Sequence, residues 1–114
     1  MHLTVKNLDI FMPYRLDVYV PEESTEAVKE ALFAAGAGRI GNYDCCCYTV
    51  KGCGQFRPLP GSNPAKGDPG DVCICPEDKL EMIVADDYMD SVIKALLKAH
   101  PYETPAFQYW KVNM

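Results

Sequence analysis

The sequence predicts an α+β fold whose elements follow the order β-α-β-β-α-β. Two observations lead to this prediction. In each half of the chain, a short segment that alternates apolar and polar residues precedes a segment whose apolar residues have helical spacing. Between the halves lies an irregular stretch that contains all 8 glycines and all 6 cysteines. An aromatic segment close to the C-terminal end supplies the last strand.

The first half predicts a strand over residues 14–20 and a helix that ends near residue 35. Three aliphatic side chains share one face of the strand: Leu16, Val18 and Val20. Pro21 ends this strand, and the glutamates that follow it are typical of a helix N-terminus. Apolar residues then recur at helical spacing until Gly36 and Gly38, which are typical of a helix C-terminus.

The rest of the chain predicts two strands, a second helix and a final strand. In chain order we expect a strand from Arg39 to about Tyr48, a Gly- and Pro-rich excursion over Gly52–Asp71, a strand at 80–85, a helix and a strand at 106–112. The helix starts after Asp86 and Asp87 and ends near His100, because Pro101 disfavours helical geometry in the residue before it.

This order of elements is that of the ferredoxin-like fold, an antiparallel sheet with both helices on one face. The other face of the sheet is then left uncovered, and Tyr19 and Tyr109 are candidates to lie on it. An exposed apolar face usually needs a partner. We therefore expect the chain to associate with copies of itself.

Length and composition limit the class of protein further. The chain has 114 residues, a formal charge of −5 and 48% apolar residues, which favours one domain, assigned to residues 12–114 with residues 1–11 as an extension. The acidic balance makes nucleic acid a poor partner. A membrane span is not expected, because no apolar run is long enough. No secretory signal is recognised, so we expect a cytoplasmic protein with reduced thiols.

Three motifs carry a family resemblance. They are VPEESTEAVKEALFAAGAGRIGNYDCC, GCGQFRPLPGSNPAKGDPGD and HPYETPAFQYW, which begin at Val20, Gly52 and His100. Over residues 12–112 the chain resembles the small CutA/PII-like domain of the YqfO (Nif-three-like) family. The resemblance implies a ferredoxin-like fold and a homo-oligomer, with a trimer as first expectation and a dimer as second. The chain lacks the metal-binding core of the larger relatives, so their suspected hydrolase-like chemistry is not carried over.

The cysteines suggest a metal site. If residues 45–47 are in a strand, Cys45 and Cys47 share one face and Cys46 points away. Thiolates bind divalent or soft transition metal ions, and we name Cys45, Cys46, His100 and Glu103 as candidate ligands. Two alternatives stay open. The thiols are small residues packed in the sheet, or one of Cys73 and Cys75 forms a disulfide with an earlier cysteine. For the HPYE motif the alternative is a purely structural connection.

The glycine-rich excursion is a candidate ligand site. Gly52, Gly54 and Gly61 allow the backbone to approach a ligand or a neighbouring subunit, and Arg57 is able to hold an anion. The pattern is not that of a Walker A loop. The alternative interpretation is that this loop braces the oligomer.

These observations favour a non-enzymatic, self-associating module that responds to a small ligand or a metal ion. One alternative is a purely structural oligomerisation domain with passive thiols. Another is a thiol-dependent enzyme in which Cys46 is the nucleophile and His100 the base.

Overall fold

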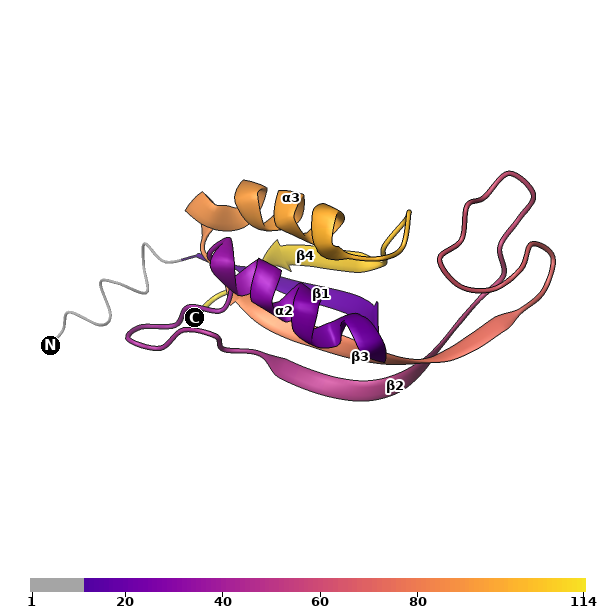
Figure 1. The fold of residues 1–114 in the computed structure, drawn as a ribbon. Helices are drawn as coiled ribbons and strands as arrows, with labels where there is room; N and C mark the ends of the chain where they lie inside the picture. Colours follow the sequence, from indigo (N-terminus) through magenta and orange to yellow (C-terminus); the bar gives the residue numbers. More distant parts are fainter. Residues whose placement is uncertain (1–11) are drawn as a thin grey trace, which may run out of the picture.

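The computed structural model describes residues 12–114, and the predicted extension at residues 1–11 lies outside the described residues. Its elements are β1 (Tyr14–Pro21), the 3-10 turn η1 (Glu22–Ser24), α2 (Thr25–Ala34), β2 (Tyr48–Phe56), β3 (Cys73–Val84), the 3-10 turn η2 (Asp86–Tyr88), α3 (Met89–Ala99) and β4 (Phe107–Lys111). The predicted order of strands and helices is confirmed (Figure 1).

The sheet is antiparallel, with strand order β2-β3-β1-β4. Both helices lie on one face of it (Figure 1). This is the arrangement of the ferredoxin-like fold, so the predicted fold class is confirmed. Within the described part of the chain, no helix is long and apolar enough to cross a membrane.

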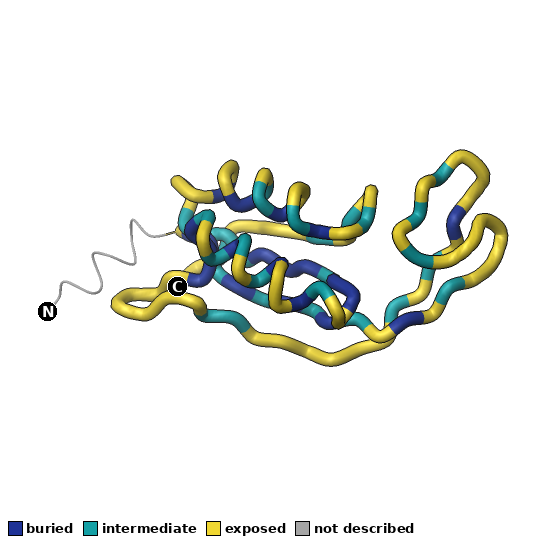
Figure 2. The backbone as a smooth tube through the Cα atoms, viewed as in Figure 1, coloured by how far each residue is buried: buried dark blue, intermediate teal, exposed yellow. Residues whose placement is uncertain are grey.

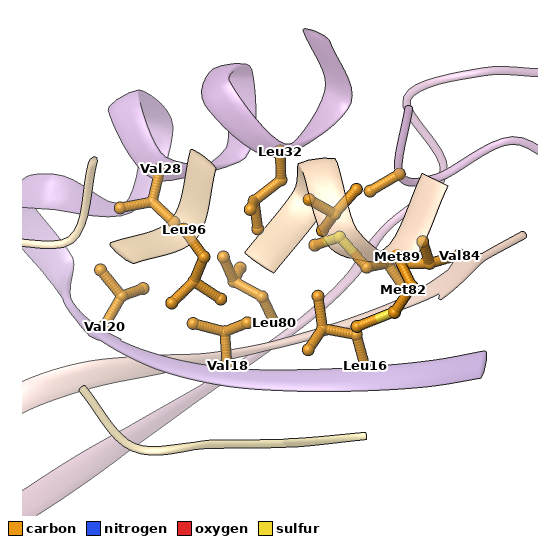
Figure 3. Close-up of a cluster of buried hydrophobic side chains, with 12 residues drawn as sticks. Leu16, Val18, Val20, Val28, Leu32, Leu80, Met82, Val84, Met89 and Leu96 are labelled. Carbon is orange, nitrogen blue, oxygen red and sulfur yellow. The ribbon is translucent and has the colours of Figure 1, made fainter. Parts of the chain in front are cut away.

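The core lies between the helices and the sheet, as Figures 2 and 3 show. The strands β1 and β3 supply one side of it and the two helices the other. Its fully buried aliphatic residues are Leu16, Val18, Val20, Val28, Leu32, Leu80, Val84, Val92 and Leu96. The alternation and helical spacing in the sequence therefore mark the faces that are buried on folding.

The prediction for the second strand is wrong in position. Instead of running from Arg39 to Tyr48, the strand β2 starts at Tyr48. Residues 39–47 form a connection with an isolated bridge between Ile40 and Tyr43. Positive φ angles at Gly38, Gly41 and Cys45 turn the chain repeatedly there, which an extended strand does not allow.

The β2–β3 hairpin is longer than the sequence indicates. The strand β2 includes Gly52 and Gly54, which were assigned to the irregular excursion, and β3 begins at Cys73 rather than at residue 80. The ends of the two strands extend beyond the helices, and the loop between them folds back (Figure 1). We call residues 52–77 the hairpin arm.

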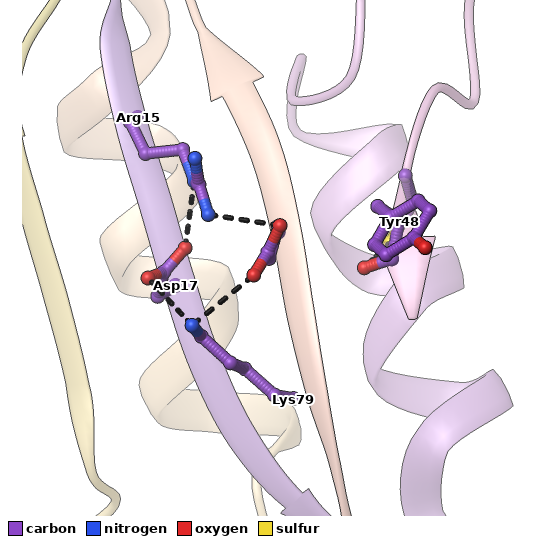
Figure 4. A network of polar contacts seen from close by, with 6 residues as sticks. Arg15, Asp17, Tyr48 and Lys79 are labelled. Atoms are coloured by element: carbon purple, nitrogen blue, oxygen red, sulfur yellow. Dashed lines mark hydrogen bonds and ion pairs between the residues drawn. The ribbon is translucent and has the colours of Figure 1, made fainter. Parts of the chain in front are cut away.

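The face of the sheet opposite the helices carries a network of alternating charges. The guanidinium of Arg15 lies 2.8 Å from Asp17 Oδ1 and 2.9 Å from Glu81 Oε1, and the ammonium of Lys79 lies 3.1 Å from Glu81 Oε2 (Figure 4). Lys79 also reaches Asp17, at 3.6 Å. These neighbours leave Asp17 only 5% exposed.

Aromatic residues border this open face. Tyr19 is on it, as expected, because it alternates with the buried Val18 and Val20. The expectation for Tyr109 was wrong, since Tyr109 pairs in register with the buried Leu16. Trp110 is on the open face instead, because it pairs in register with Arg15, which is on that face. The guanidinium of Arg15 lies 5.6 Å from the centroid of the indole.

Candidate functional site

A pocket of about 270 Å³ lies between the hairpin arm and the connection from α3 to β4. Segments distant in the sequence form its wall: the end of β1, both strands of the hairpin, the arm loop and the α3–β4 connection. The lining residues are Tyr19, Gln55, Phe56, Pro58, Ser62, Pro64, Ala65, Lys66, Glu77, Tyr102, Glu103, Thr104 and Ala106. A concave site of this kind is the usual place for a small ligand.

Three polar side chains form a cluster at this pocket. The Tyr102 hydroxyl donates to Glu77 Oε2 at 3.1 Å, and the Cys75 thiol lies 3.6 Å from that hydroxyl and 3.7 Å from the same carboxylate oxygen. Burial raises the pKa of Cys75 and, together with the hydrogen bonds to Cys75 and Glu77, that of Tyr102. Both groups therefore stay protonated near neutral pH, and Glu77 accepts their hydrogen atoms.

Gly54 makes room for this cluster. A Cβ atom at Gly54 would overlap the carboxylate of Glu77, which lies over its backbone. In register, Gly54 pairs with Cys75, so the glycine and the cluster are held together by the hairpin. Because Gly54 has no side chain, the carboxylate of Glu77 is able to lie over the backbone of β2 at this point.

Two contacts tie the arm loop to the body of the domain. The backbone N–H of Asn63 donates to Glu103 Oε1 at 2.8 Å, and Lys66 forms an ion pair with Glu23. The hydrogen bond between the two side chains raises the pKa of Lys66 and lowers that of Glu23. The loop is therefore bound at both the α3–β4 connection and η1, and these contacts hold it along one side of the pocket.

His100 has a structural role in this arrangement. Its Nε2–H donates to the backbone carbonyl of Tyr19 at 2.7 Å, and its Nδ1 accepts the backbone N–H of Tyr102 at 3.1 Å. Burial lowers the pKa of His100, so the ring is neutral near neutral pH. Because both ring nitrogens are bound to backbone, neither is free for a metal ion or a catalytic proton.

Cys45 and Cys46 lie at the other end of the sheet. Cys46 bonds through its backbone N–H to Gly38, which in turn bonds to Ile83 of β3. His100 instead bonds to the backbone carbonyl of Tyr19 in β1, and Tyr19 pairs with Lys79 of β3 in the register of the sheet. The two attachment points, Ile83 and Lys79, are four positions apart in β3, a distance of about 13 Å along the strand.

The four predicted metal ligands are therefore not brought together. Cys45 and Cys46 are at one end of the sheet, whereas His100 and Glu103 are beside the pocket at the other. Residues 45–47 are not in a strand, so the predicted alternation of their side chains does not apply. Among residues 12–114, no group of three His, Cys, Asp or Glu side chains is placed to hold a metal ion. The six cysteines are all free, and burial raises the pKa of Cys47.

The predicted ligand-binding residues of the excursion are close to the pocket without lining it. Gly52 and Gly54 are in β2, Gly61 is in the arm loop with a φ of 93°, and Arg57 is exposed beside Phe56. Of the site residues named from the sequence, Glu103 lines the pocket, whereas sequence reasoning missed the other lining residues, above all Phe56, Lys66, Glu77 and Tyr102. The only signal for them was the position of Phe56, Lys66 and Tyr102 within the family motifs.

Comparison with known proteins gives a consistent result. No family model matches the sequence. The chain is 40% identical over 114 residues to a "GTP cyclohydrolase 1 type 2 homolog" of Halalkalibacterium halodurans, a match that covers 95% of this chain and 31% of that protein. A solved structure of a Bacillus cereus protein related to NIF3 matches with 34% identity and a TM-score of 0.76, over 90% of this chain and 26% of that one.

The chain is related to the YqfO (Nif-three-like) family. It spans about a third of the length of the curated relative from H. halodurans. More distant structures share the fold alone: CutA of Synechococcus elongatus, with 15% identity and a TM-score of 0.55 over 90% of this chain and 78% of that one, and GlnK of Bacillus subtilis, with 14% identity and a TM-score of 0.52 over 89% and 82%. The predicted CutA/PII-like fold is thereby confirmed.

Proposed function

We propose that this YqfO-type domain is a non-enzymatic, self-associating module that binds a small ligand in the pocket between the hairpin arm and the α3–β4 connection. The observation that carries the proposal is the pocket itself, one side of which is formed by the arm and held by the Asn63–Glu103 and Lys66–Glu23 contacts. A ligand that touches both the arm and the body changes how firmly the arm is held. The module works in the cytoplasm, where its six free thiols stay reduced.

The chemistry of the site supports binding more than catalysis. The neutral His100 has no free nitrogen, and Cys75 and Tyr102 stay protonated near neutral pH. Cys46, the nucleophile of the enzyme alternative, lies at the opposite end of the sheet from His100. A nucleophile requires an activating base within hydrogen-bond reach, which this pair lacks.

Filling the pocket tests the ligand proposal. Ala65→Trp places an indole against the lining from an exposed position on the arm loop, away from the core. Val72→Trp is the control, because Val72 is an exposed arm residue that does not line the pocket. In a ligand-observed NMR screen of small metabolites, we expect compounds that bind the wild type and the control but not Ala65→Trp. If no compound distinguishes the two variants, the pocket is not a ligand site.

Self-association is proposed through the open face of the sheet. That face presents Tyr48 and Trp110, which are 68% and 44% exposed in the single chain. It also presents positive and negative charges in alternation, those of Arg15, Asp17, Lys79 and Glu81. Two copies of this face are therefore able to place opposite charges against one another. A trimer is the first expectation and a dimer the second, as the family resemblance implies.

The mass of the particle in solution tests this part. We expect sedimentation equilibrium to give a multiple of 12.7 kDa for the wild type. Trp110→Glu should lower the mass, whereas Leu97→Glu, which changes an exposed apolar residue on α3, should leave it unchanged. A monomeric wild type at high protein concentration contradicts self-association. An oligomer that survives Trp110→Glu contradicts the choice of face.

A further inference from the structure

The aromatic side chains of the pocket provide ring faces for a ligand. Phe56 comes from β2 and Tyr102 from the α3–β4 connection, with ring centroids 5.6 Å apart and planes inclined by 59°. Tyr19 of β1 lines the same cavity. Aromatic rings that converge from several segments attract cations through the negative potential of their faces.

The charges in the pocket favour a cation as well. Lys66 is the one basic residue in the lining, and its ammonium is already paired with Glu23 outside the cavity. Two carboxylates line the pocket without a basic partner among residues 12–114: Glu77 and Glu103. Each uses one oxygen for the contacts described above, with Tyr102 and with Asn63. The second oxygen of each accepts no hydrogen bond within the described part of the chain.

We propose that the pocket binds a small organic cation, an amine or a quaternary ammonium compound. The inference rests on the proposed ligand site and names the chemical class that the site takes. The ring faces of Phe56 and Tyr102 contact the cationic head, and Glu77 and Glu103 supply the countercharge. A cavity of about 270 Å³ suits a small molecule.

Matched probes separate charge from shape. Choline chloride is the cationic probe, and 3,3-dimethyl-1-butanol is its neutral isostere. We expect choline to bind about tenfold more tightly than the alcohol in NMR titrations, because a desolvated cation–π contact supplies roughly that factor. Binding of choline should be lost in Ala65→Trp and kept in Val72→Trp.

Matched variants test the named residues. Glu77→Gln keeps the shape of the side chain and removes its charge, and should weaken choline binding about tenfold, whereas Glu30→Gln, the same change on the exposed side of α2, should not. Phe56→Leu removes a ring without a charge change and should also weaken choline binding. It serves as a second test if Glu77→Gln disturbs the fold.

Other outcomes overturn the inference while leaving the ligand site itself in place. Equal affinity for choline and the alcohol rules out recognition of charge. Binding of inorganic phosphate in place of choline, with sensitivity to Ala65→Trp, shows an anion site at Lys66. Tighter binding of Nα-acetyl-lysine amide than of choline overturns the small free compound as ligand, because the cation then belongs to a lysine side chain of a protein. If none of these probes binds, but the metabolite screen finds ligands sensitive to Ala65→Trp, only the proposed cation is refuted.

Discussion

Replacing His100 with alanine should destabilise the domain and loosen the pocket. The imidazole is 5% exposed and connects three segments: the end of α3, the end of β1 and the α3–β4 connection. Without it, the carbonyl of Tyr19 and the N–H of Tyr102 lose their partners. An unsatisfied polar group away from water costs about 1–3 kcal/mol, so for these two groups we expect the free energy of unfolding to fall by about 2–6 kcal/mol.

The same residue should make stability depend on pH. Burial lowers the pKa of His100 in the folded state below its ordinary value of 6.5, whereas in the unfolded chain the ring titrates near that value. As the pH falls through 6.5, the unfolded state binds a proton that the folded state does not, so the free energy of unfolding decreases. The slope is at most about 1.4 kcal/mol per pH unit.

Urea unfolding followed by circular dichroism at pH 7.5, 6.5 and 5.5 and at one protein concentration measures both effects. His2→Ala is the control for the pH slope, since it removes the other histidine of the chain. The slope should persist in His2→Ala and disappear in His100→Ala. A loss in His100→Ala below about 0.5 kcal/mol, or an unchanged slope, would refute the structural role assigned to this ring.

Four further predictions concern the core, the pocket and the thiols. Leu80→Ala, in the fully buried core, should lower the free energy of unfolding by about 2–5 kcal/mol in urea titrations. Gly54→Val should displace Glu77 and abolish ligand binding in the NMR screen, whereas Gly52→Val, where a Cβ meets nothing closer than 3.6 Å, should keep it. Asp78→Ala should lower stability by about 1–3 kcal/mol, because this buried carboxylate accepts from Thr25 at 2.6 Å and joins β3 to α2. Iodoacetamide under denaturing conditions without reductant should add six carbamidomethyl groups by mass spectrometry, and fewer would show a disulfide.

Much of the fold was predictable because it depends on local periodicity. The alternation of Leu16, Val18 and Val20 identifies the buried face of a strand whatever its neighbours are. The apolar face of α3 and its end before Pro101 follow in the same way from side-chain spacing and proline geometry. The order of these elements was then sufficient to predict the sheet and the uncovered face.

The second strand was not predictable from the same signals. Residues 48–56 include two glycines and are mostly exposed, so no apolar alternation marks them. They form a strand because β3 offers them a continuous row of backbone partners, from Glu81 to Cys73. Residues 39–47, which precede them, turn at Gly41 and Cys45, where φ is positive, and so do not extend into a strand.

The chain by itself determined which faces of β1, α2, β3 and α3 form the core, since each repeat of apolar residues depends only on the geometry of its own helix or strand. Tertiary structure alone decided the site. Phe56, Lys66, Glu77 and Tyr102 meet because the register of the hairpin and the path of the arm loop bring them together. Tertiary structure also separated Cys46 from His100, because the points of β3 to which they are linked, Ile83 and Lys79, lie about 13 Å apart along the strand. Contacts between distant segments depend on register and chain path, and no short window of sequence encodes these.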